Sequence, residues 1–180
     1  MSENTVENRS EANAGKTKRL VLTGLFFAVA LVLSIVESML PPVPLPVPGV
    51  KFGLSNIAVM YALFFLSKGQ AYTIAVLKAM FVLVTRGLIA AILSLFGGIL
   101  SLTVMIVLLF LFKSRVSYLL LSIFGAVAHN IGQFIAITFI YAGLNLWAYL
   151  PVLAVSGVVA GIATATLLRF ILPAFNRLVK

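Results

Sequence analysis

Six predominantly apolar segments alternate along the chain with short polar, basic or proline-containing breaks. A membrane-spanning helix needs about 20 apolar residues at about 1.5 Å per residue, and backbone polar groups in lipid are satisfied internally by helices. A β-barrel would alternate apolar and polar positions, and these segments do not. We therefore predict an all-α integral membrane protein with six transmembrane helices, at residues 20–40, 52–66, 70–85, 88–112, 116–144 and 148–172.

The predicted membrane domain covers residues 20–172. It is preceded by a polar cytoplasmic tail at 1–19 and followed by a basic cytoplasmic C-terminus at 173–180. The first apolar segment is not a signal peptide, because it is too long and because proline-rich sequence without a small-x-small cleavage site follows it. The second and third segments are short, so these helices either tilt little or lie where the protein thins the lipid path.

Composition supports a lipid environment, since 62% of residues are hydrophobic and only 9% are charged. The net charge of +9 comes from basic residues scattered between apolar segments, which form no continuous stripe for nucleic acid. Beyond residue 20 the chain contains one carboxylate, Glu37. The absence of cysteine excludes disulfides, thiolate chemistry and cysteine-based metal sites.

The distribution of basic residues predicts the orientation. With the N-terminus inside, only Lys51 and Arg86 fall in outer connections, and an excess of Lys and Arg marks the cytoplasmic side. We therefore predict a multi-pass protein of the cell membrane with both termini cytoplasmic. The basic residues that fall inside are Lys16, Lys18, Arg19, Lys68, Lys113, Arg115, Arg177 and Lys180.

A proline-rich segment at residues 41–50 forms the first outer connection. Its five prolines impose an extended, stiff backbone. Two interpretations are open. The segment is a rigid connector, or it is an apolar lid over an outward-facing cavity, whose stiffness lowers the cost of closing.

Charged side chains within spans are costly, so each one is a candidate functional residue. Glu37 falls near the outer end of the first span, where it pairs with a cation, binds a ligand, or does both. Lys78 is central in the third span and either neutralises Glu37 or lines a wet cavity for an anionic or carbonyl-bearing ligand. Arg86 precedes a predicted turn at Gly87, where interfacial anchoring is the simplest role.

The fifth span contains the densest group of small and polar residues. At about 100° per residue, Gly125, His129, Gly132 and Gln133 share one face, and Asn130 lies on its flank. Such residues either hold helices together or line a ligand site. A metal site is not predicted, because His129 is the only histidine and a single carboxylate lies within the spans.

Asn56, near Lys51, either completes a polar cluster in the outer half of the bundle or caps its helix together with Ser55. The predicted ligand-binding set is the group of polar residues in the outer half of the bundle and at its mouth. It consists of Glu37, Lys51, Asn56, Lys78, Arg86, His129, Asn130 and Gln133.

Two pairs of small residues are spaced by four positions. Gly157 with Gly161 and Gly24 with Ala28 are interpreted as packing seams, where small residues let helices approach closely. No glycine-rich phosphate loop ending in Lys-Ser or Lys-Thr is present, so the chain is not predicted to hydrolyse ATP.

At these residues the sequence resembles the Gx transporter family, over about residues 20–170. Many of its members carry the older label heptaprenyl diphosphate synthase component I, and the family is similar to the S-components of energy-coupling-factor transporters. The motifs that carry the resemblance are Glu37-Ser-Met-Leu-Pro-Pro, Pro48-Gly-Val-Lys-Phe-Gly-Leu-Ser-Asn56, Gly97-Gly98, Gly125-Ala-Val-Ala-His129-Asn130-Ile-Gly-Gln133 and Tyr149-Leu-Pro-Val-Leu-Ala-Val-Ser-Gly157.

The resemblance implies a six-helix bundle that binds a small molecule from outside and has no ATPase or cofactor of its own. In S-components a small-residue seam on the first helix docks a coupling subunit, and Gly24 with Ala28 occupy a comparable place here. Relatives that occur with flavin-bearing proteins and quinone synthesis enzymes suggest a quinone, isoprenoid or flavin ligand. The implied partners are membrane lipid and a coupling or electron-transfer subunit.

The synthase label is testable on chemistry. Prenyl transfer from diphosphates needs aspartate-rich motifs that hold Mg²⁺, and this chain has no aspartate. An accessory, non-catalytic subunit of a polyprenyl diphosphate synthase is therefore the second interpretation.

Overall fold

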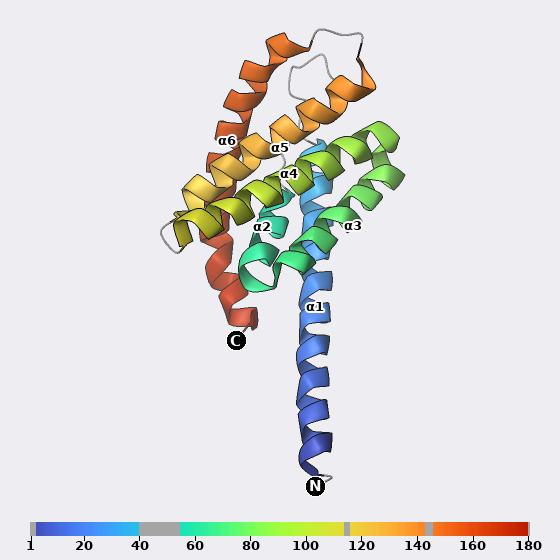
Figure 1. Ribbon diagram of the computed structural model, residues 1–180, viewed down its shortest axis with the longest axis vertical. Helices are drawn as coiled ribbons and strands as arrows, with labels where there is room; N and C mark the ends of the chain where they lie inside the picture. The colour runs from blue at the N-terminus through green and yellow to red at the C-terminus, as the bar shows by residue number, and fades with distance from the viewer. Residues whose placement is uncertain (1–2, 40–54, 114–115, 143–145, 180) are drawn as a thin grey trace.

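The computed structural model describes residues 3–39, 55–113, 116–142 and 146–179, and this part of the chain is helical without strands (Figure 1). The proline-rich segment and Lys51, which the sequence analysis singled out, lie outside the described residues. The helices are α1 (Glu3–Met39), α2 (Asn56–Phe65), α3 (Lys68–Arg86), α4 (Leu88–Phe112), α5 (Tyr118–Ile140), the short 3-10 helix η2 (Trp147–Tyr149) and α6 (Leu150–Val179).

Four helical stretches are long and apolar enough to cross a membrane, which is the signature of a multi-pass membrane protein. They are Asn13–Met39, Leu88–Phe112, Tyr118–Ile140 and Trp147–Phe170. Their outer faces are apolar as well: Phe110, Phe139 and Phe170 are at least three-quarters exposed, as expected for side chains in contact with lipid. The prediction of six helices is confirmed, whereas membrane-spanning length and apolarity are found for four of them.

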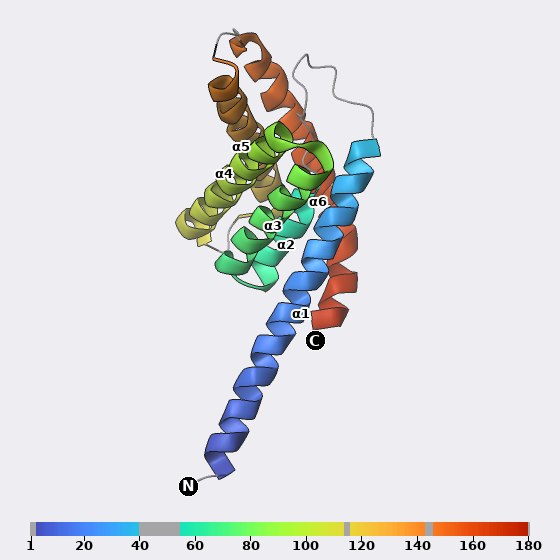
Figure 2. The same cartoon turned by 90° about the vertical axis from the view of Figure 1, so that its right-hand side faces the viewer.

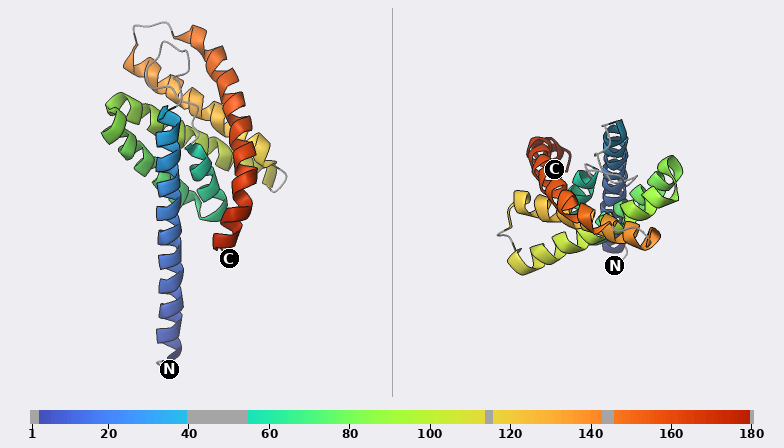
Figure 3. Two further views of the ribbon diagram at one scale, coloured as in Figure 1. Left: turned by 180° about the vertical axis from the view of Figure 1, so that it is seen from behind. Right: turned by 90° about the horizontal axis from the view of Figure 1, so that it is seen from above.

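The six α-helices of the described residues alternate in direction, so both ends of the chain point toward the same end of the molecule (Figure 1). The short helix α2 lies between α1 and α6 (Figure 3) and contacts α1, α3, α4 and α6. All of its residues from Asn56 to Leu63 are buried. The core is therefore centred on α2, with Phe26 of α1 packing on Tyr61 at a ring-centroid distance of 4.6 Å.

The N-terminal segment predicted as a polar tail is helical from Glu3 and continues into the first span as one helix. Its 37 residues give α1 a length of about 56 Å. The amide of Gln70, at the start of α3, donates to the Arg19 carbonyl at 3.4 Å and to the Thr23 hydroxyl at 3.0 Å. The part of α1 before Arg19 therefore extends beyond the bundle (Figure 2).

Two short connections join α3 to α2 before it and to α4 after it. Ser67 caps α3, because its hydroxyl accepts from the backbone N–H of Gln70 at 3.2 Å. Gly87, predicted as a turn, separates α3 from α4 with φ of +86°, a left-handed conformation that favours glycine. Together these residues fix α3 between two sharp reversals.

Glycines bring α4, α5 and α6 into direct backbone contact. A Cβ on Gly132 would lie 2.7 Å from the Phe96 carbonyl oxygen, and one on Gly161 would lie 2.5 Å from the Ile123 Cα. A Cβ on Gly157 would lie 2.9 Å from the Cα of Val127 on α5. The predicted packing seam at Gly157 and Gly161 is thus confirmed, since larger residues would separate the helices.

The other predicted seam, Gly24 with Ala28, does not pack within the chain. Both residues are exposed, and a Cβ on Gly24 would meet nothing within 4 Å. The interpretation of this pair as an internal packing seam is wrong, because the neighbouring Phe26 and Ala30 face the bundle instead. The pair remains on the outer surface of α1.

Gly132→Ala is expected to lower the free energy of unfolding by about 1–3 kcal/mol, because the new methyl group pushes the α4 backbone away. Gly24→Ala is the matched control, and it should be neutral or stabilise by up to about 1 kcal/mol through helix propensity. Thermal unfolding in an uncharged detergent compares the two variants. Equal effects would contradict the assignment of a close contact at Gly132.

Candidate functional site

A small polar cavity lies inside the otherwise apolar bundle, where five structural elements meet. Its volume is about 20 Å³, enough for one ordered water molecule. The lining side chains come from α1, α3, α4 and α5, and from Ser55, which directly precedes α2. They are Ser34, Glu37, Ser55, Lys78, Val82, Arg86, Ala90, Ser94, His129 and Gln133.

Lys78 forms the floor of this cavity and is 2% exposed. Its Nζ donates to Asn56 Oδ1 at 2.6 Å and to Ser55 Oγ at 3.2 Å. Asn56 is the first residue of α2 and Ser55 precedes it, so the buried start of α2 supplies oxygens to the ammonium. A buried ammonium requires such partners, and one of its three N–H donors remains for an oxygen in the cavity.

Glu37 and Arg86 line the same cavity from α1 and α3. Glu37 is 4% exposed, and its carboxylate attracts both Lys78 and Arg86. Arg86 Nη2 donates to the hydroxyl of Ser34 at 3.2 Å, one helical turn before Glu37. The cavity is therefore lined by two cations and one anion. Lys78 attracts Glu37 and also lines a polar cavity, while its predicted role in ligand binding stays a prediction.

His129 and Gln133 form the opposite wall, one turn apart on α5. Their side-chain nitrogens, His129 Nε2 and Gln133 Nε2, lie 3.1 Å apart, and which atom donates depends on the histidine tautomer. Both side chains are buried, and among the described residues Nδ1 of His129 and Oε1 of Gln133 have no hydrogen-bond partner. Gly97 of α4 packs directly on the His129 ring, where a Cβ would lie 2.7 Å from Nδ1.

Asn130, predicted for the same site, points to another helix. Its Nδ2 donates to the Leu153 carbonyl at 2.8 Å and to Ser156 Oγ at 3.1 Å, both on α6. Asn130 thus joins α5 to α6 and does not line the cavity. Of the five residues expected to converge, the structure brings together Glu37, Lys78, His129 and Gln133, with Arg86 beside them and Asn56 behind Lys78.

Five lining residues lie outside the ligand-binding set predicted from the sequence: Ser34, Ser55, Val82, Ala90 and Ser94. Ser34 precedes Glu37 by three positions and so shares its helix face, a signal that was present in the sequence. Ser94 and Ala90 lie one turn apart on α4, but a single serine among apolar residues carries little information. Small side chains at these positions leave room for the long ones of Lys78 and Arg86.

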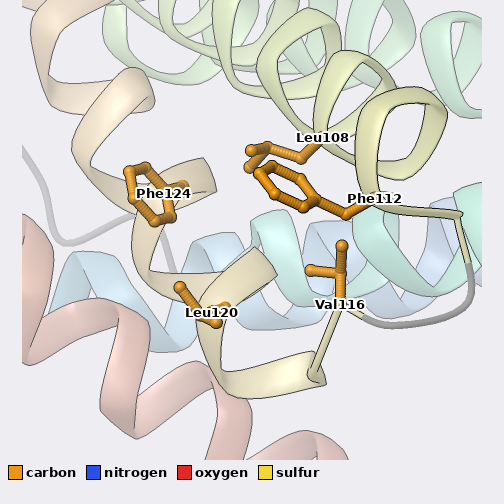
Figure 4. A pocket seen from close by; sticks show the side chains of 5 residues that line it. All are labelled: Leu108, Phe112, Val116, Leu120 and Phe124. Atoms are coloured by element: carbon orange, nitrogen blue, oxygen red, sulfur yellow. The ribbon is translucent and has the colours of Figure 1, made fainter.

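A separate crevice between the end of α4 and the start of α5 has the opposite character. It has a volume of about 270 Å³ and is lined by apolar side chains, Leu108 and Phe112 from one helix and Leu120 and Phe124 from the other, with Val116 between them (Figure 4). Such a crevice suits the hydrocarbon of membrane lipid. None of its described lining residues carries a polar side chain that would select a head group.

The polar cavity is chemically suited to bind the oxygen of an anion. Two cations offer N–H donors in a low-dielectric site, where charge-assisted hydrogen bonds are strong. Gln133 Oε1, which has no partner among the described residues, offers a hydrogen-bond acceptor in the same cavity. Among the described residues, no group of three or more His, Cys, Asp or Glu side chains is placed to hold a metal ion.

Comparison with known proteins gives one family. No significant match was found among curated proteins or among solved structures. The model of the family described as heptaprenyl diphosphate synthase component I matches residues 26–171, which contain the whole polar cavity. Because the match covers most of the chain and its motifs, this protein belongs to the heptaprenyl diphosphate synthase component I family.

Proposed function

We propose that the protein is a membrane-embedded subunit that binds and transports a small molecule without an ATPase of its own, in the manner of an energy-coupling-factor S-component. The observation that carries this proposal is the polar cavity, in which three charged side chains are enclosed at membrane depth. Charges there are costly and are retained for function. The excess of cations favours a ligand with an anionic or carbonyl group.

In this proposal all six helices belong to the membrane domain, and both termini are cytoplasmic. α3 has 19 residues and a length of about 28 Å, close to the hydrocarbon thickness, and its charge at Lys78 faces the cavity. α2 is only about 15 Å long, and its burial among other helices removes it from lipid. The start of α3 and the end of α4 lie toward the end of the molecule where the chain begins and ends (Figure 1). Lys68 is the first residue of α3, Lys113 follows α4, and Lys16 and Lys18 belong to the first half of α1, an arrangement that fits the positive-inside rule.

The partner is proposed to dock on α1. Gly24 and Ala28 are exposed and leave the helix backbone accessible to a helix of another subunit. A membrane coupling subunit fits this surface, because a protein that hydrolyses no ATP needs a motor from elsewhere. An electron-transfer subunit is the alternative partner.

A second candidate function follows from the family description. A non-catalytic membrane subunit of a polyprenyl diphosphate synthase, or one that handles quinones or isoprenoids, agrees with the four long apolar helices and with the absence of aspartate. Its ligand would be a polyprenyl or quinone species. A transport subunit would instead retain a water-soluble molecule.

The topology is tested with a reporter fused after Lys180. Six spans return the chain to the side on which it starts. A reporter that is active only in the cytoplasm should therefore be active at this position, and a reporter that is active only outside the cytoplasm should be inactive. Activity on the outer side would contradict the proposed topology. A fusion within residues 41–50 is the matched control and should give the opposite result.

Gly24→Leu and Ala28→Leu are expected to reduce copurification of the membrane partner by about tenfold, because a bulky side chain blocks close helix approach. Thermal stability should be unchanged, since both residues are exposed. The control is Val32→Leu, which adds bulk farther along the exposed side of α1. Unchanged copurification in both variants would refute this docking surface and leave the fold untouched.

Gln133→Met is expected to reduce retention of the native ligand by about tenfold, because it removes the amide that lines the cavity while keeping a side chain of similar volume. It should also lower the free energy of unfolding by about 1–3 kcal/mol, because the buried His129 Nε2 loses its partner. Asn130→Leu is the matched control on the same helix. It should leave retention unchanged and lower the free energy of unfolding by about 1–2 kcal/mol, because it removes the bonds to α6.

Untargeted mass spectrometry of extracts from the purified proteins measures retention, and thermal unfolding measures stability. A water-soluble anionic species that depends on Gln133 supports the binding and transport subunit. An enriched polyprenyl or quinone species supports the second candidate. Equal retention by the wild type and both variants would show that the cavity does not hold the ligand.

A further inference from the structure

The cavity is too small for a ligand in this conformation. Its volume of about 20 Å³ accommodates a water molecule, whereas even a carboxylate or phosphate group needs more space. A ligand group therefore enters only when one of the lining side chains moves out. The identity of that side chain decides what kind of ligand the site accepts.

Lys78 is held in place from behind. Asn56 and Ser55 bind its ammonium at the buried start of α2, and α2 is packed on every side. His129 is fixed by Gly97, which contacts its ring, and by Gln133 at 3.1 Å. These side chains form a rigid frame.

Glu37 differs from them in its position. It lies two residues before Met39, the last described residue of α1, and its neighbours Ser38 and Met39 are exposed. Its carboxylate interacts with Lys78 and Arg86, and a change of its side-chain rotamers would turn it from the cavity toward the exposed end of the helix. Among the charged lining residues Glu37 is the one anion, so its departure is the one that leaves both cations to a ligand.

The charges state the same conclusion. With Glu37 inside, the cavity holds two positive charges and one negative charge. When Glu37 leaves, two cations remain, and the vacated place next to both suits one carboxylate or phosphate oxygen. Arg86 contributes a fork of donors, of which one reaches Ser34, and Lys78 contributes the donor that Asn56 and Ser55 do not use.

We propose that Glu37 is an internal counter-ion, and that a small anionic ligand binds by replacing its carboxylate between Lys78 and Arg86. This inference rests on the proposed function, which it deepens by naming the ligand as an anion with a carboxylate or phosphate group. Gln133 Oε1, unpartnered on the facing wall, accepts a hydrogen bond from a donor elsewhere on that ligand. Glu37 thus competes with the ligand and does not bind it.

The full-length protein in an uncharged detergent is titrated with sodium acetate and, separately, with sodium phosphate, and dissociation constants are taken from the rise in melting temperature. Glu37→Gln should bind at least one of the two anions about tenfold more tightly than the wild type, because the competing charge is gone. Glu11→Gln is the matched control, since it removes the same charge from the projecting part of α1 and should bind like the wild type.

Glu37→Asp serves if Glu37→Gln does not fold. It keeps the charge but withdraws the carboxylate by one methylene, so its affinity should fall between those of the wild type and Glu37→Gln. Tighter binding of acetate identifies a carboxylate ligand, and tighter binding of phosphate identifies a phosphorylated one. Adding Lys78→Gln to Glu37→Gln should abolish the gain, which places the anion at this cavity.

Folded Glu37→Gln that binds both anions no more tightly than the wild type would overturn the proposal, as would Glu37→Asp in its place. Such a result leaves the proposed function standing, because ligand retention dependent on Gln133 is a separate observation. Loss of that retention effect, in turn, would refute the proposed function whatever the anion titration shows.

Discussion

The burial of the Lys78 ammonium is the constraint on which the arrangement of the first three helices depends. An ammonium inside an apolar bundle is tolerated only with oxygen partners, and α2 supplies two of them at its first turn. A helix of only ten residues, α2, therefore lies at the centre of the molecule, in contact with α1, α3, α4 and α6. Glu37 of α1 supplies the opposite charge in the same cavity, so α1, α2 and α3 all contribute polar groups around the Lys78 ammonium.

The second half of the molecule follows a different principle. There, glycines bring backbones together, and polar side chains serve either the cavity or the neighbouring helix. Gly97 and Gly132 allow α4 and α5 to approach closely, and His129 of α5 lines the same cavity as Lys78. Asn130, one residue later and about 100° around the helix, is turned to α6 instead. On α5, adjacent residues thus have different roles: His129 lines the cavity, and Asn130 joins the helix to α6.

The sequence predicts the helices well because their boundaries carry strong signals. Gly87 and Lys113 delimit α4 at the predicted residues, since one adopts a left-handed turn and the other ends the apolar run. Helical periodicity also predicts that His129 and Gln133 share a face. It does not say which neighbouring helix each face meets, and so the partner of Asn130 on α6 and the outward direction of Gly24 required the packed structure.

The single continuous helix α1 has a mechanical consequence. No proline interrupts it between Glu3 and Met39, so its projecting end and the cavity residue Glu37 belong to the same stiff rod. A rotation or an axial displacement of the projecting end is therefore transmitted along one continuous helix to the Glu37 carboxylate, more than 30 residues away. A subunit that binds this helix outside the bundle can therefore alter the position of the Glu37 charge inside the cavity.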